Sequence, residues 1–159
     1  MVEFYLKSNE IKSFRLMSYN EAMALPRYIR ECGYNWWLST PAAISKDEEG
    51  NDRTMYVAED GVVESLFGAE ADKRFAVRPV IECNVDSVIE PGGYVIIGGW
   101  LTQYVGWKNN FDQFLFCEPL NKFCSFNNVD IELDRGLENI KEEYCERKYK
   151  DEGSDSDCW

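Results

Sequence analysis

The most constraining feature of the sequence is a pair of adjacent tryptophans, Trp36 and Trp37. Each large aromatic side chain buries about 150–250 Å² on folding, so the pair carries too much apolar surface to remain in water. The surrounding stretch, residues 34–84, contains three short apolar segments separated by polar loops. It therefore predicts a small packed unit with the two tryptophans in one of its strands.

Two further signals define the shape of this unit. Asp60-Gly61 lies between two apolar runs and predicts a hairpin, because glycine accepts the positive φ that a tight turn needs. Pro79 biases Arg78 toward an extended backbone. We therefore expect an antiparallel arrangement, with the double-tryptophan strand at one side and a strand containing Val77-Arg78-Pro79 at the other.

These three motifs, in this order, resemble a C-type-lectin-like domain family that is abundant in low-GC Gram-positive bacteria and their phages. The resemblance covers about residues 11–84. The sequence departs from the family at Ser39, where the family usually has arginine, and in an acidic insertion at residues 46–53. The matching positions are Trp36, Trp37, Leu38, Pro41, Tyr56, Val57, Gly61, Val62, Val77, Arg78 and Pro79. Among these, Trp36, Trp37, Tyr56, Gly61, Arg78 and Pro79 are the expected structural motif.

The resemblance implies an α+β, C-type-lectin-like fold with short twisted antiparallel strands and two flanking helices. We expect one such domain over residues 1–149 and an acidic disordered tail over residues 150–159. Residues 98–105, 114–117 and 130–149 are similar to parts that other family members place before these motifs. The segment order is either permuted or the similarity is coincidental, and the sequence leaves both open.

The N-terminal half predicts further elements. Strands are expected at residues 1–6, 14–17 and 34–39. A helix begins at Ser18, because Ser18 with Glu21 matches a capping box, and it runs to about residue 32 with an interruption at Pro26. Residues 42–54 are expected to be a loop, residues 54–58 and 62–65 a hairpin, and residues 68–73 a polar connection. Residues 75–83 read as one strand.

The C-terminal half predicts strands at residues 94–97, 100–107 and 113–117. From residue 128 the apolar period becomes helical, with Leu133, Leu137, Ile140 and Tyr144 on one stripe.

Composition excludes several classes of function. The chain of 159 residues contains no histidine, which removes Ser-His-Asp and Cys-His catalysis and histidine zinc sites. A net charge of −12 argues against direct nucleic-acid binding. No apolar run is long enough to span a membrane, and the N-terminus shows no signal pattern, so a cytoplasmic protein is expected.

The six cysteines form no C-x-x-C pair. Free, mostly buried thiols are the expected state, and a disulfide framework would be favoured only if the protein were extracellular.

No pattern of ligands points to a metal, a cofactor or a catalytic group. Alternating carboxylates occur at Asp130, Glu132 and Asp134, but without the glycine and terminal glutamate of a calcium loop. The triplets at residues 107–109 and 118–120 depart from those of calcium-dependent lectins. We therefore expect neither calcium-mediated sugar binding nor catalysis.

Function is consequently expected in variable loops on a fixed scaffold. The hypothesis is a non-catalytic recognition module with a protein partner, using the loops at residues 42–54, 68–73 and 106–112. The alternative is a phage-encoded acidic inhibitor of the anti-defence type, which blocks a basic nucleic-acid-binding protein. The remaining interpretation is that these loops have no binding role and are only polar, solvent-exposed connections. The candidate binding residues are Asp47, Glu48, Glu49, Arg53, Trp107, Asn109 and Asn110.

Overall fold

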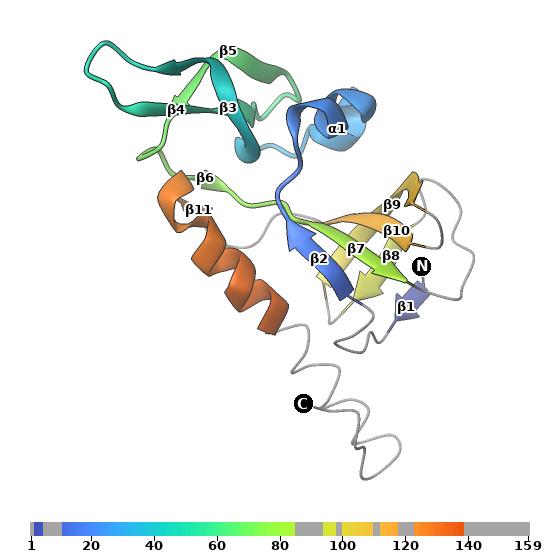
Figure 1. The fold of residues 1–159 in the computed structure, drawn as a ribbon. Helices are drawn as coiled ribbons and strands as arrows, with labels where there is room; N and C mark the ends of the chain where they lie inside the picture. The colour runs from blue at the N-terminus through green and yellow to red at the C-terminus, as the bar shows by residue number, and fades with distance from the viewer. Residues whose placement is uncertain are drawn as a thin grey trace. The chain divides into compact units, whose positions relative to one another are not determined.

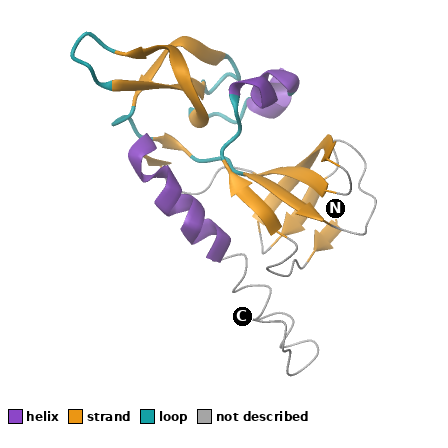
Figure 2. Cartoon of the chain, in the orientation of Figure 1, coloured by secondary structure: helices purple, strands orange, loops and turns teal. Residues whose placement is uncertain are grey.

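The fold is mixed α+β, built mostly of strands with a few short helices (Figures 1 and 2). The computed structural model describes residues 2–4, 11–84, 94–97, 100–109, 112–117 and 123–138. Its packing divides the chain into two compact units, each assembled from separate stretches. The α+β prediction is confirmed at this level. One domain over residues 1–149 stays a prediction, and the tail at residues 150–159 lies outside the described residues.

The first unit contains residues 1–15, 79–118 and 133–159 and is organised around a six-stranded sheet of order β1-β8-β9-β10-β7-β2. Only β1 and β8 pair in parallel, and the other neighbours are antiparallel. β7 lies inside the sheet with Val80, Ile81 and Cys83 buried. The strands are β1 (Val2–Phe4), β2 (Ile11–Arg15), β7 (Val80–Asn84), β8 (Tyr94–Ile97), β9 (Trp100–Asn109) and β10 (Asp112–Cys117).

The second unit contains residues 16–78 and 119–132 and holds a five-stranded sheet of order β11-β6-β3-β4-β5. β3 and β6 pair in parallel, and the other neighbours are antiparallel. β5 is therefore an edge strand of this sheet. The strands are β3 (Trp36–Lys46), β4 (Asp52–Val57), β5 (Val63–Glu70), β6 (Phe75–Ala76) and β11 (Phe123–Cys124).

The two tryptophans form the core of the second unit, as their apolar area predicts. Both are fully buried at the start of β3. Trp37 packs against Phe75 and Phe126, with ring centroids 4.5 and 5.5 Å apart. Its indole N–H donates to the carbonyl of Cys124 at 2.9 Å, so the buried polar edge is satisfied.

Two short helices precede β3. α1 (Tyr19–Ala24) begins with the predicted capping box, in which Ser18 accepts from the Glu21 N–H and Glu21 accepts from the Ser18 N–H. It ends before Pro26, because the residue before a proline disfavours helical backbone. α2 (Arg27–Arg30) follows. The predicted interruption at Pro26 is confirmed.

The predicted hairpin between β4 and β5 is present. Gly61 has φ +88°, and the Ala58 N–H donates to the Val62 carbonyl at 2.7 Å. A side chain at position 61 would meet the Arg27 carbonyl at 3.0 Å, so space as well as backbone conformation favours glycine here.

Arg78 is a buried cation that binds the end of α2. Its guanidinium donates to the carbonyls of Ile29 and Arg30, at 3.2 Å each, and lies 5.0 Å from the centre of the Trp36 ring. The Trp36 indole donates to the same Arg30 carbonyl at 3.0 Å. The last carbonyls of a helix carry partial negative charge, which favours a cation at this position.

Two predicted connections differ in extent from the structure. The loop predicted at residues 42–54 is wrong in extent, because β3 runs to Lys46 and β4 starts at Asp52. The connection predicted at residues 68–73 is shorter, because β5 continues to Glu70. In both cases cross-strand hydrogen bonds extend the strands beyond what local composition indicates.

The single strand predicted at residues 75–83 is also wrong. The chain forms β6 and β7, which belong to different sheets. Pro79 lacks an N–H for a strand ladder, so a break just before β7 has a local cause.

Residues 129–138 are helical after a 3₁₀ turn, η2 (Phe126–Asn128). Leu133 is buried, as the apolar stripe predicts, and Leu137 is half-buried. Ile140 and Tyr144 lie outside the described residues. Among the described cysteines, Cys83 and Cys124 are buried, Cys32 is half-buried, and these three take part in no disulfide. Within the described part of the chain, no helix has the length and apolarity needed to cross a membrane.

Replacing Arg78 with lysine should destabilise the protein although the charge is kept. Lysine cannot place a planar guanidinium over the Trp36 ring while donating to two carbonyls. We expect the free energy of unfolding to fall by about 2–4 kcal/mol in urea titrations. Lys73→Arg exchanges the same two kinds of side chain at an exposed position; it is the control and should change the free energy of unfolding by less than about 0.5 kcal/mol. Equal losses in the two variants would contradict the role given to Arg78.

Candidate functional site

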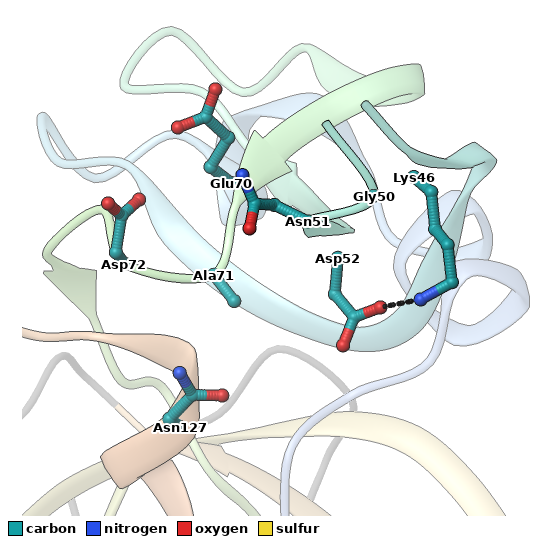
Figure 3. Close-up of a pocket in the computed structure, with 8 residues that line it drawn as sticks. All are labelled: Lys46, Gly50, Asn51, Asp52, Glu70, Ala71, Asp72 and Asn127. Atoms are coloured by element: carbon teal, nitrogen blue, oxygen red, sulfur yellow. Dashed lines mark hydrogen bonds and ion pairs between the residues drawn. The ribbon is translucent and has the colours of Figure 1, made fainter. Parts of the chain in front are cut away.

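The second unit contains a polar pocket of about 330 Å³ at one end of its sheet (Figure 3). Three segments build it: the turn between β3 and β4, the segment that follows β5, and η2. Its lining is mostly polar and includes three carboxylates and one ammonium group. The lining residues are Lys46, Gly50, Asn51, Asp52, Glu70, Ala71, Asp72 and Asn127.

Asp47 organises the first wall of the pocket. One of its carboxylate oxygens accepts from the backbone N–H groups of Glu49 and Asn51, at 2.9 and 2.8 Å, and the other accepts from the Asn51 side chain at 3.2 Å. Gly50 supplies the positive φ of +85° that the turn needs. The backbone hydrogen bond from Asn51 is the main reason why the pKa of Asp47 is lowered from its ordinary value.

Backbone hydrogen bonds fix the other walls relative to this turn. The Ala71 N–H donates to the Asp52 carbonyl at 3.2 Å, which joins the segment after β5 to the start of β4. The Phe126 N–H donates to the Ala71 carbonyl at 2.9 Å, which brings η2 and Asn127 to the same place. Three segments distant in sequence therefore meet at this pocket through main-chain contacts.

The pocket is electrostatically negative. It has three carboxylates, Asp52, Glu70 and Asp72, against one ammonium group, Lys46. The Lys46 Nζ lies 2.6 Å from an Asp52 oxygen, and Glu70 lies 3.5 Å from Arg53. Figure 3 marks the Lys46–Asp52 pair with a dashed line. The Lys46–Asp52 pair is well exposed to solvent, so it holds its partners only weakly. An incoming guanidinium or ammonium group can therefore compete with Lys46 for the Asp52 carboxylate.

The predicted binding residues fall into two groups. Glu48 and Glu49 are exposed at the tip of the β3–β4 turn, beside the pocket, while Asp47 holds the turn. Arg53 directs its guanidinium to the backbone of β5 and to Glu70. These four residues belong to the same unit as the pocket, which also combines the predicted loops at residues 42–54 and 68–73.

The remaining candidates lie in the other unit. Trp107 and Asn109 belong to β9, and Asn109 pairs with Asp112 at the start of β10. The loop predicted at residues 106–112 is therefore wrong in extent, because β9 runs to Asn109 and β10 starts at Asp112. Asn110 lies outside the described residues.

Sequence reasoning did not single out the pocket carboxylates. Asp52, Glu70 and Asp72 lie in or beside the two predicted loops, but only tertiary pairing brings them together. Asn127 had no local signal at all. Among the residues that the structure describes, no group of three or more His, Cys, Asp or Glu side chains is placed to hold a metal ion.

Comparison of the chain with protein-family models, curated proteins and solved structures finds no match.

The lowered pKa of Asp47 predicts how this residue contributes to stability with pH. The stabilisation by the Asp47 carboxylate is complete at pH values above 3.8, its ordinary pKa in the unfolded chain. It is lost as the pH falls through the lower pKa of the folded protein. Asp47→Asn should therefore be less stable than the wild type near pH 7, with the difference shrinking at about pH 2.5. Urea titrations across this range measure it.

Glu48→Gln is the control, because it removes a charge from the same turn at an exposed position. It should not reproduce the loss of stability near pH 7. A difference between Asp47→Asn and the wild type that grows as the pH falls would refute the assignment.

Proposed function

We propose that the protein is a non-catalytic recognition module, with a C-type-lectin-like scaffold, that binds a protein partner at the acidic end of its second unit. The pocket lined by Asp52, Glu70 and Asp72 receives a lysine or arginine side chain of that partner. The exposed carboxylates Glu48 and Glu49 widen the negative surface around it.

The placement of the motif residues supports the scaffold part of this proposal. Trp36 and Trp37 begin β3, Tyr56 lies opposite Trp37 on β4, and Gly61 turns the next hairpin. Arg78 contacts Trp36 directly. Motifs that are separate in sequence thus meet in one small unit, which is what a shared structural role would require.

The observation that carries the binding part is the convergence of two loops on one acidic pocket. Main-chain hydrogen bonds hold the pocket walls, so little ordering is needed when a partner binds. Its volume of about 330 Å³ is at the small end of ligand sites, a size suited to one side chain rather than a large molecule. Charge-assisted hydrogen bonds to carboxylates then favour a basic side chain over a neutral one.

The acidic inhibitor is the second candidate, and the net charge of −12 favours it. Such a protein would present diffuse negative charge to a basic nucleic-acid channel, so its binding would not depend on a particular pocket. It would also weaken steeply as salt rises, because screening removes long-range attraction.

Neutralising the pocket should weaken selective binding. We propose selecting random displayed peptides on the wild type and on the triple variant Asp52→Asn, Glu70→Gln, Asp72→Asn. Peptides enriched on the wild type should contain lysine or arginine and bind the triple variant about 10- to 100-fold more weakly. Fluorescence anisotropy with the labelled peptides measures the affinities.

The control variant is Glu31→Gln, Glu59→Gln, Asp130→Asn. It makes the same change in net charge at exposed positions of the same unit that do not line the pocket. Binding should persist in the control, and partly at about 0.5 M salt. Equal losses of affinity in both triple variants, with complete loss of binding at high salt, would contradict the pocket proposal. They would support the acidic inhibitor, which binds through diffuse charge.

A further inference from the structure

β5 carries an apolar protrusion that the proposed pocket does not use. Leu66 and Phe67 are neighbours in sequence and are 54% and 57% exposed, although both side chains are large and apolar. They lie in an irregularity where four residues of β5, 65–68, face the single residue Met55 of β4. We call residues 65–68 the β5 bulge.

Specific contacts hold the β5 bulge in place. The Arg53 guanidinium donates to the Phe67 carbonyl at 2.6 Å and to the Gly68 carbonyl at 3.2 Å. Gly68 has φ +54°, and a Cβ there would overlap the Thr54 carbonyl oxygen. The backbone of β5 therefore approaches β4 as closely as only glycine permits, and the two apolar side chains are presented on a fixed loop.

The β5 bulge and the pocket are physically connected. Arg53, which binds the bulge carbonyls, also reaches Glu70 of the pocket lining, with Nη1 3.5 Å from the carboxylate. One side chain thus links the two features on the same strand. Phe67 precedes Glu70 by three residues on β5, a span of at most about 10 Å, so a partner segment of a few residues is long enough to reach from the pocket to the bulge.

The chemistry around the bulge selects the occupant. Glu64 and Glu70 lie on the same strand on either side of Leu66 and Phe67. A second copy of this chain would bring like charges together at these positions, and an anionic membrane surface would be repelled. The bulge also interrupts the edge of β5, which disfavours pairing with another extended strand. An apolar segment with basic neighbours matches both the side chains and the charge.

We infer that the β5 bulge is a second contact element for the partner, and that it takes an apolar side chain next to the lysine or arginine bound in the pocket. This inference rests on the proposed function and specifies the partner as a basic segment with adjacent large apolar residues.

The test uses the same library of random displayed peptides with the double variant Leu66→Ser, Phe67→Ser. Peptides enriched on the wild type should carry Leu, Ile, Phe or Trp beside the basic residue. They should bind the double variant about 10- to 100-fold more weakly, because burial of one large apolar side chain is lost. Binding to the pocket variant should fall as well.

Two further variants distinguish the loss of a binding contact from a loss of folding. The exchange Leu66→Phe, Phe67→Leu keeps the apolar surface and should retain binding within a few-fold. The matched control Met23→Ser, Tyr28→Ser removes two exposed apolar side chains from α1 and α2 and should leave binding unchanged.

The outcomes distinguish the two proposals. Enriched peptides that are basic but carry no adjacent apolar residue, and that bind the double variant as well as the wild type, would overturn the inference and leave the pocket standing. A library that yields no basic peptide on the wild type would overturn both. Dimerisation of the wild type that Leu66→Ser, Phe67→Ser abolishes would assign the bulge to a second copy instead.

Discussion

The second unit depends on the buried guanidinium of Arg78. Removing a cation from water is costly, and it is tolerated only where the surroundings replace the lost hydration. Here the carbonyls of Ile29 and Arg30 and the face of Trp36 provide that replacement. Since Trp36 begins β3 and Arg78 follows β6, this contact holds both ends of the β3–β6 segment against α2.

The same short helix also anchors the hairpin between β4 and β5. Arg30 donates to the Gly61 carbonyl at 2.9 Å and to the Leu25 carbonyl at 3.1 Å, so it connects the hairpin turn to the end of α1. Arg27 donates to the Asp60 carbonyl at 3.0 Å. The sequence motifs around Trp36, Gly61 and Arg78 are therefore parts of one hydrogen-bonded arrangement around α2.

Features with a local cause could be predicted from the sequence, and features created by pairing could not. The Ser18–Glu21 capping box and the Asp60-Gly61 turn each need only a few neighbouring residues, and both are present. The extension of β3 to Lys46 depends on β4, which no local pattern reveals. The same reason applies to the site. The acidic loop could be predicted from the sequence, but its position beside Asn127 depends on tertiary contacts that no local pattern indicates.

The proposed specificity depends on groups that are held in place, and not on the overall negative charge. A net charge of −12 attracts basic molecules of every shape, so charge alone gives rate and affinity but little selection. Selection requires groups at fixed positions. Main-chain hydrogen bonds fix the pocket walls, and Arg53 fixes the β5 bulge beside them. A partner that presents a basic and an apolar side chain at the matching spacing satisfies both, whereas one that presents only charge leaves Leu66 and Phe67 in water.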